Sequence, residues 1–240
     1  METKQKAALY LIPVTLGETE LSHVLPQKNI EIIKSLTHFI VEDIKTARRF
    51  LAQCDKTLKI ETFTFYELNE HTDLKSIGNY LNPIIKNGIS MGVISEAGCP
   101  AVADPGSAVV AMAHEKNIPV VPLVGPSSMI LAVMASGMNG QSFAFNGYLP
   151  VKPNERASKI RQLESRAYNE NQTQLFIEAP YRNVQMFNSI LQCCRPQTKL
   201  SIASGLTTDK EFIKTKTVAE WKKCEVPEIH KVPAIFLIYR

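Results

Sequence analysis

The segment Ser95–Gly106 is the part of the sequence whose residue types and spacing point most directly to chemistry. It reads SEAGCPAVADPG, with two glycines, two prolines and two carboxylates, and it follows an apolar run that is typical of a strand, Ile89–Ile94. Connections between a strand and a helix usually have ~2–6 residues, and a longer one usually has a function. Because small residues let a ligand approach backbone N–H and C=O groups, we predict that this segment is a ligand-binding loop.

Two shorter loops with small residues occur at equivalent places in the first half of the chain. Pro13–Gly17 follows the apolar run Ala8–Ile12, and Gly125–Ser128 follows Pro119–Val124. In an open parallel sheet, ligands bind beyond the carboxyl ends of the strands. The three loops together therefore predict one binding edge, although each loop taken singly is more typical of an ordinary turn.

The elements that must position these loops alternate between strands and helices. Runs typical of strands occur at Ala8–Ile12, His38–Val41, Ile60–Tyr66, Ile89–Ser95 and Pro119–Val124, and helical spacing occurs at Ile44–Gln53, Asp73–Lys86, Ser107–Glu115 and Ser127–Ser136. This alternation predicts an N-terminal α/β domain over residues 1–122, with a mostly parallel sheet and helices on both faces.

The second half of the chain has a different pattern. Strands are predicted at Ser142–Phe145, Gln174–Glu178, Leu200–Ala203, Glu211–Thr217 and Ala234–Tyr239, and helices at Asn154–Ala167 and Asn183–Cys193. Three late strands in succession favour a mixed sheet, so we expect a C-terminal α/β domain of α+β-like type over residues 123–240. No low-complexity linker separates the halves, which predicts that they pack tightly.

Composition excludes several classes of protein. The 240 residues are 45% hydrophobic and carry a formal charge of only +4, which fits folded domains and not a disordered chain. The five cysteines include no CxxC pair and the five histidines have no metal-binding spacing, so we expect reduced thiols and no metal. Neither a dinucleotide fingerprint nor a P-loop is present. The sequence has no signal peptide and no run near the ~20 apolar residues of a membrane span, which predicts a cytoplasmic protein without membrane contact.

Six segments, in one order along the chain, carry a resemblance to a known family. They are YLIPVTLG at residues 10–17, Glu42-Asp43 with Arg48-Arg49, the Ser95–Gly106 loop, PLVGPSS at residues 122–128, GYLP at residues 147–150 and EAPYR at residues 178–182. The chain resembles the tetrapyrrole methylase superfamily, the class III S-adenosylmethionine-dependent methyltransferases. Within it, the chain is most similar to the branch that 2′-O-methylates a cytidine of small-subunit ribosomal RNA, whose hallmark SDAGTPLISDPG matches Ser95–Gly106.

The resemblance implies a fold, a cofactor and a partner. It implies two α/β domains with S-adenosylmethionine in the cleft between them, usually a homodimer, acting on ribosomal RNA or the small ribosomal subunit. The cofactor-binding positions that it implies are Pro13, Ser95, Glu96, Ala97, Gly98, Ser127 and Ser128, followed by Ala179, Leu206 and Ala234. Lys152 and Arg182 are the substrate-binding positions expected in the second half.

Methyl transfer to a ribose hydroxyl also needs a group that removes the proton. The candidate catalytic carboxylates are Asp43, Asp104 and Glu178, with Glu178 chosen through the resemblance alone. Capping of a helix N-terminus is a somewhat better explanation of Asp43. A local hydrogen bond in the Asp-Pro-Gly turn explains Asp104 equally well.

The second half also contains a basic helical stretch. Residues 152–166 carry five basic side chains against two acidic ones. Such an excess can bind RNA phosphates, although a solvated helix face is the commoner explanation.

The chain departs from the ribosomal branch mainly at polar positions. Glu96 stands where the family has aspartate, Ile44 where it has threonine, and Val151 where it has a basic residue. Ser204–Thr208 reads SGLTT where the branch has RELTK. Two alternatives therefore stay open: a methyltransferase of a tetrapyrrole or other small molecule, and a protein that binds S-adenosylmethionine with little catalytic activity.

Overall fold

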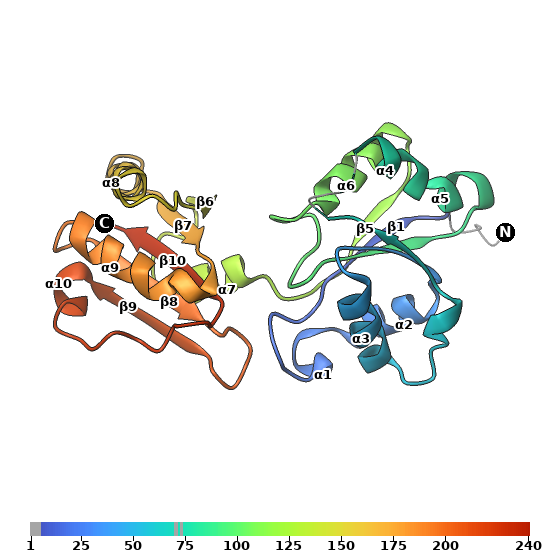
Figure 1. The fold of residues 1–240 in the computed structure, drawn as a ribbon, viewed down its shortest axis with the longest axis horizontal. Coiled ribbons are helices and arrows are strands. Elements are labelled where there is room, and N and C mark those ends of the chain that lie inside the picture. Colours follow the sequence, from blue (N-terminus) through green and yellow to red (C-terminus); the bar gives the residue numbers. More distant parts are fainter. Residues whose placement is uncertain (1–5, 70–71, 73) are drawn as a thin grey trace. The chain divides into compact units, whose positions relative to one another are not determined.

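The computed structural model describes residues 6–69, 72 and 74–240 and divides the chain into two compact units (Figure 1). Unit 1 comprises Met1–Pro126 and unit 2 comprises Ser127–Arg240. The boundary expected after residue 122 lies shortly before this division. Within the described ranges, none of the helices has the length and apolar character that a membrane crossing requires.

Unit 1 is built on a parallel five-stranded sheet. Its strands are β1 (Leu9–Ile12), β2 (His38–Val41), β3 (Thr64–Glu67), β4 (Met91–Ile94) and β5 (Val120–Pro122), in the order β3-β2-β4-β1-β5. Its helices are α1 (Leu21–Val24), α2 (Gln27–Lys34), α3 (Ile44–Cys54), α4 (Leu74–Tyr80), α5 (Asn82–Asn87) and α6 (Gly106–Glu115), with a 3-10 turn η1 (Ile60–Thr62). All neighbouring strands are parallel, so they end at the same edge of the sheet. The predicted parallel sheet is confirmed.

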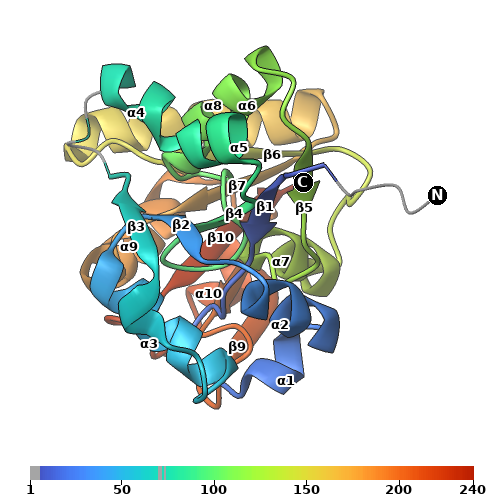
Figure 2. The same cartoon turned by 90° about the vertical axis from the view of Figure 1, so that its right-hand side faces the viewer.

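Apolar side chains cover both faces of this sheet. Ile40 and Val93 pack on one face with residues of α4, α5 and α6. Phe39 and Ile94 pack on the other face with residues of α2 and α3. Figures 1 and 2 show these helices as two layers on opposite sides of the sheet. Burial on both faces explains why strands such as β4 are apolar at successive positions.

Three parts of unit 1 differ from the sequence-based prediction. Within Ile60–Tyr66 only the last residues join the sheet, because residues 60–62 form a 3-10 turn in which Thr62 Oγ1 donates to the Lys59 carbonyl at 2.7 Å. The helix predicted over residues 73–86 is two helices, since Pro83 starts α5 and cannot continue the hydrogen bonding of α4. Asp73 itself lies outside the described residues. The short helices α1 and α2 are additions to the prediction.

Unit 2 is built on a mixed five-stranded sheet. Its strands are β6 (Phe143–Tyr148), β7 (Thr173–Ile177), β8 (Lys199–Ser204), β9 (Phe212–Thr217) and β10 (Ala234–Tyr239), in the order β6-β7-β10-β8-β9. Its helices are α7 (Ser128–Ser136), α8 (Pro153–Asn169), α9 (Asn183–Cys193) and α10 (Val218–Trp221), with a 3-10 turn η2 (Pro180–Arg182). The β6–β7 pair is parallel and the other pairs are antiparallel. This confirms the predicted mixed sheet.

The core of unit 2 centres on aromatic side chains. Phe176 and Phe236 stack on neighbouring strands with ring centroids 5.9 Å apart. Phe187 of α9 meets Trp221 of α10 edge-on at 5.5 Å, and Trp221 Nε1 donates to the Leu200 carbonyl at 2.9 Å. Such pairs contribute beyond the apolar area that they bury. The same core includes residues of α8, whereas α7 packs against β8, β9 and β10.

The register of the second sheet brings several segments to one edge. Tyr148 at the end of β6 pairs with Ile177 at the end of β7, and Ile177 pairs with Ile235 of β10. Ala234 pairs with Ser204 at the end of β8. The GYLP turn, the residues after β7 and the β8–β9 turn therefore lie along the same edge, which we call the unit 2 edge.

Candidate functional site

Three loops meet at the carboxyl edge of the unit 1 sheet. The amide of Val14 donates to the carbonyl of Gly98 at 2.9 Å, which joins the loop after β1 to the loop after β4. The thiol of Cys99 donates to the carbonyl of Pro126 at 3.4 Å, which joins the loop after β4 to the loop after β5. We call residues 13–17, 95–106 and 123–126 the loop junction. The structure thus brings together the loops that the sequence placed at one edge.

Two glycines permit this close approach. A Cβ on Gly125 would lie 2.3 Å from Cγ of Pro13, far inside van der Waals contact. Gly98 has a φ of 70°, and a Cβ there would lie 3.1 Å from Cδ2 of Leu16. The junction therefore requires glycine at both positions. Pro13, Ser95 and Gly98 are buried in it, while Glu96 and Ala97 are exposed.

Asp104 organises the long loop from within. Its Oδ1 accepts hydrogen bonds from the amides of Ala101 at 2.8 Å and Gly106 at 2.7 Å. These bonds hold a stretch in which Ala101 and Ala103 have φ values of 64° and 60°, which are uncommon for residues with a Cβ. The local hydrogen bonds expected of an Asp-Pro-Gly turn are present. The other oxygen, Oδ2, is buried and accepts no hydrogen bond from the residues that the structure describes.

The surroundings of Asp104 change its acidity. Burial raises the pKa of Asp104, although the amides of Gly106 and Ala101 and the nearby Ser95 hydroxyl act in the opposite direction. Together with Glu42 and Ser95, Asp104 lines a cavity of about 10 Å³, roughly the space of one water molecule. A carboxylate with a raised pKa is a better proton acceptor than an ordinary aspartate.

A groove of about 420 Å³ opens beside Ser95 and Glu96. The loop after β1 lines it on one side, and α3 contributes Thr46, Arg49 and Gln53 on the other. The hydroxyl of Thr46 donates to Oε1 of Glu96, which ties α3 to the long loop. The volume is in the range of small-molecule sites.

Two of the predicted residues serve as helix caps. Oδ1 of Asp43 accepts a hydrogen bond from the amide of Thr46 at 2.8 Å at the start of α3, and this bond lowers the pKa of Asp43. The capping explanation of Asp43 therefore describes its contacts, and the lowered pKa makes it a weaker proton acceptor. Ser127 caps α7 by accepting a hydrogen bond from the amide of Ile130 at 3.5 Å. Ser127 and Ser128 belong to unit 2.

Glu178 is the best-anchored charge on the unit 2 edge. Its Oε1 accepts hydrogen bonds from the amide of Ala179 at 2.7 Å and from Nε and Nη2 of Arg182 at 3.0 and 2.6 Å. The side chain is almost completely buried, and the carboxylate raises the pKa of Arg182. Oε2 is buried and has no hydrogen-bond partner within the described part of the chain.

The β8–β9 turn lies on the same edge. The amide of Gly205 donates to the Pro233 carbonyl at 3.0 Å, next to the start of β10. Leu206 and Ala234, two predicted cofactor residues, are both buried. The hydroxyls of Ser204 and Thr207 are buried without partners among the described residues, so this edge also presents polar atoms that a ligand can satisfy.

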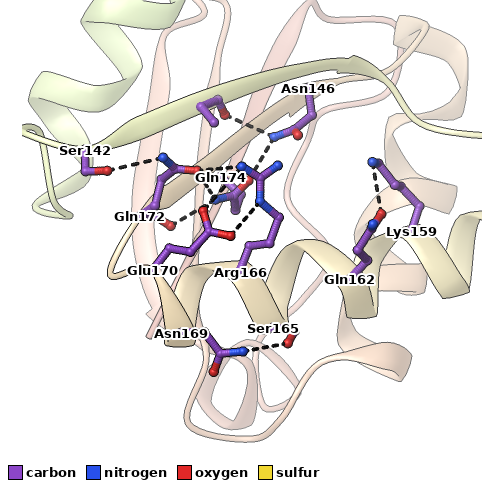
Figure 3. A network of polar contacts seen from close by, with 11 residues as sticks. Ser142, Asn146, Lys159, Gln162, Ser165, Arg166, Asn169, Glu170, Gln172 and Gln174 are labelled. Carbon is purple, nitrogen blue, oxygen red and sulfur yellow. Dashed lines mark hydrogen bonds and ion pairs between the residues drawn. The ribbon is translucent and has the colours of Figure 1, made fainter.

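The basic stretch of α8 is largely occupied by contacts inside unit 2. Lys152 pairs with Glu155 at 3.1 Å, and Arg156 is buried, donating to Ser189 and to the Val151 carbonyl. Figure 3 shows the C-terminal end of α8, where Arg166 contacts Glu170 and Gln172. Lys159 contacts Gln162 on the same helix. Lys152, at the start of this stretch, has the most exposed side chain of the described ion pairs, at 80%.

The structure therefore gathers the predicted residues into two sets. Pro13, Ser95–Gly98 and Asp104 belong to the loop junction of unit 1, and Glu178, Ala179, Arg182, Leu206 and Ala234 belong to the unit 2 edge. Sequence reasoning missed Thr46, whose partner Glu96 is fifty residues away. It also missed Ser204 and Thr207, because no pattern marks a buried hydroxyl without a partner. Across the residues that the structure describes, no three His, Cys, Asp or Glu side chains are grouped as metal ligands.

Comparison with curated proteins gives a consistent set of relatives, although no family model matches the chain. The chain is 28% identical over 212 residues to Ribosomal RNA small subunit methyltransferase I of Vibrio cholerae serotype O1, covering 88% of this chain and 69% of that protein. It is 28% identical to the protein of the same name from Mesorhizobium japonicum, covering 88% and 67%. The chain thus spans about two thirds of the length of these relatives.

Solved structures show the same fold at lower sequence identity. The methyltransferase CobJ superposes with a TM-score of 0.62 at 13% identity, covering 97% of this chain and 99% of that one. Uroporphyrin-III C-methyltransferase from Thermus thermophilus, complexed with S-adenosylhomocysteine, superposes with a TM-score of 0.54 at 18% identity, covering 98% of both chains.

The loop junction predicts opposite effects of two alanine substitutions in unit 1. Gly125→Ala places a Cβ against Pro13, so we expect it to lower the free energy of unfolding by about 1–3 kcal/mol. Gly78→Ala in α4 is the control, because its Cβ would come no nearer than 3.9 Å to Met112. Alanine there should be neutral or stabilising by up to about 1 kcal/mol. Denaturant unfolding followed by circular dichroism measures both, and equal midpoints would contradict the close approach of Gly125 and Pro13.

The raised pKa of Asp104 predicts a pH dependence of stability. Since the folded-state pKa lies above the unfolded value of ~3.9, the stabilising contribution is full below that value and is lost as the pH rises through the folded-state pKa. Asp104→Asn keeps an oxygen acceptor but does not titrate. The free energy of unfolding of the variant relative to the natural protein should therefore increase as the pH rises above about 4, the unfolded-state pKa. A pH-independent difference, or one of opposite sign, would overturn this assignment.

Proposed function

We propose that this chain, a divergent member of the tetrapyrrole methylase superfamily, is an S-adenosylmethionine-dependent methyltransferase that acts on a ribose 2′-hydroxyl of small-subunit ribosomal RNA. The observation that carries the proposal is the Ser95–Gly106 loop. Its sequence is the most specific match to the family, and the loop is joined to two neighbouring loops at the carboxyl edge of a parallel sheet, where ligands bind. Relatives named for ribosomal RNA methylation align over most of the chain and support the choice of acceptor.

The residues at the two edges fit this cofactor. S-adenosylmethionine carries an amino group on the adenine, two ribose hydroxyls and an ammonium group, all of which donate hydrogen bonds. Oδ2 of Asp104 and Oε2 of Glu178 are buried acceptors without partners among the described residues. Leaving such an atom unsatisfied costs about 1–3 kcal/mol, so a donor that reaches either oxygen gains that amount back.

The residues that would hold the cofactor are the positions that the family resemblance implies in each unit. In unit 1 they are Pro13, Ser95, Glu96, Ala97 and Gly98, and in unit 2 they are Ser127, Ser128, Ala179, Leu206 and Ala234. The bound cofactor supplies a methyl group on a positively charged sulfur, which is a good electrophile with a good leaving group. The protein therefore mainly holds and orients the reacting groups.

Removal of the acceptor proton falls best to Asp104 among the three candidate carboxylates. Burial raises its pKa, and Oδ2 is left free by the hydrogen bonds that Oδ1 accepts. Asp43 is held ionised as a helix cap. Glu178 forms an ion pair with Arg182 at 2.6 Å, whereas the hydrogen-bond donors to Asp104 are uncharged backbone amides. We therefore assign the proton acceptor to Asp104 and a positioning role to Glu178.

One observation favours a second acceptor class. The segment Ser204–Thr208 contains no charged residue, and the ribosomal branch has three at the corresponding place. Contacts to RNA phosphates usually come from lysine and arginine. A small uncharged or tetrapyrrole acceptor is the alternative that this difference supports. The cytoplasmic location predicted from the sequence and the homodimer implied by the resemblance stay predictions.

The direct test uses small ribosomal subunits from a strain that lacks the gene. Purified chain and S-adenosylmethionine with an isotopically labelled methyl group are added, and the RNA is digested and mapped by mass spectrometry. We expect one new methyl group on a ribose. An unchanged RNA, from a chain that binds the cofactor in calorimetry, would reject ribosomal RNA as the acceptor.

Two variants extend this test to the proton acceptor. Asp104→Asn should lower the rate of methyl transfer about 10²–10⁴-fold, the usual contribution of a general base. Glu115→Gln, on the exposed end of α6, is the control and should keep the rate of the natural protein. Equal rates for both variants would remove Asp104 from the reaction.

A further inference from the structure

Two tyrosine rings are exposed on the unit 2 edge. Tyr148 is 65% exposed and Tyr181 is 60% exposed, whereas tyrosine is on average intermediate in burial. Tyr148 ends β6 and pairs with Ile177, the last residue of β7. Tyr181 lies in η2, which comes shortly after Ile177 in the chain. Figure 1 shows β6 and β7 next to each other. The two rings therefore belong to one short stretch of the edge.

The ring of Tyr181 is held in place by a chain of contacts that begins in the core. The buried carboxylate of Glu178 binds Nε and Nη2 of Arg182. Nη1 of Arg182 donates to the hydroxyl of Tyr181 at 2.7 Å, and the guanidinium carbon lies 5.0 Å from the ring centroid. A ring fixed before binding loses little conformational entropy when a ligand stacks on it. The exposure of Tyr181 is thus combined with a defined orientation.

Basic residues occur in the segments next to the two rings. Lys152 follows the GYLP turn and is 80% exposed, with Glu155 as a solvent-exposed partner. The backbone of Lys231 donates to the Pro180 carbonyl at 3.0 Å, which places an exposed lysine beside η2. Aromatic rings set among cations match single-stranded nucleic acid, whose bases stack and whose phosphates are negative.

We propose that Tyr148 and Tyr181 form a stacking platform for unpaired bases of the RNA, with Lys152, Arg182 and Lys231 next to its phosphates. This inference rests on the proposed function, since it assigns the residues that receive an RNA acceptor. Tyr181 stands where the ribosomal branch has histidine and Tyr148 where it has phenylalanine, so both positions keep a ring. The platform supplies affinity on an edge where Ser204–Thr208 lacks the charged residues of that branch.

The test measures binding of a fluorescently labelled, unstructured RNA dodecamer by anisotropy. Tyr148→Ala and Tyr181→Ala should each weaken binding about 5- to 150-fold, the value of one stacked base. Tyr148→Phe and Tyr181→Phe should stay within about threefold, because the ring is kept. Tyr148→Leu and Tyr181→Leu keep apolar bulk without an aromatic face and should resemble alanine. Phe143→Ala, at the other end of β6 and 38% exposed, is the matched control and should bind like the natural protein.

A second readout separates stacking from charge. The salt dependence of binding should be unchanged in the tyrosine variants and shallower in Lys152→Ala and Lys231→Ala, because lysines displace counterions and tyrosines do not. Tyrosine variants that bind RNA like the natural protein would overturn the platform and leave the proposed function intact. Leucine variants that bind RNA with the affinity of the natural protein would overturn it as well. So would tyrosine variants that lose self-association in light scattering while their affinity for RNA is unchanged. A natural protein that methylates no RNA in the subunit assay marks the failure of the proposed function itself.

Discussion

Direct contact between three loops is the constraint on which the candidate site depends. The Val14–Gly98 hydrogen bond, the Cys99–Pro126 contact and the packing of Gly125 on Pro13 leave the loop after β4 little freedom to move independently. Asn29 of α2 adds a hydrogen bond to the Val124 carbonyl at 2.8 Å, so the helical layer also supports the junction. Each contact is individually modest, at about 1 kcal/mol for a typical hydrogen bond. Together they fix where the backbone of Ser95–Gly98 is presented.

Both units place a carboxylate at the edge of a sheet and use it in the same way. One oxygen of Asp104 and one oxygen of Glu178 are saturated by nearby N–H groups, and the second oxygen of each is buried without a partner among the described residues. The saturated oxygen shapes the local backbone or holds Arg182. The second oxygen is costly without a ligand and favourable with one. In each unit, one carboxylate oxygen therefore stabilises the local structure and the other is available to a ligand.

The sequence predicted the strands well because both faces of the unit 1 sheet are buried, which makes each strand a short apolar run. It was wrong for the start of Ile60–Tyr66, where a side-chain hydrogen bond of Thr62 stabilises a turn that apolar content does not reveal. It placed the loop junction correctly because parallel strands end at one edge. The link from Thr46 to Glu96 and the exposure of Tyr181 depend on how distant segments pack, and no local pattern encodes them. The basic residues of α8 show the same limit, since their count did not disclose that Arg156 is buried.

Amide hydrogen exchange with and without S-adenosylhomocysteine tests the central claim most directly. This reaction product occupies the cofactor site without further reaction, and exchange reports each segment of the backbone separately. If the loop junction binds the cofactor, exchange should slow in residues 95–106 and 123–126 and in the segment around Glu178, while the exposed end of α6 stays unchanged. Binding detected by calorimetry with no protection of residues 95–106 would contradict the account, because the cofactor would then lie elsewhere on the molecule.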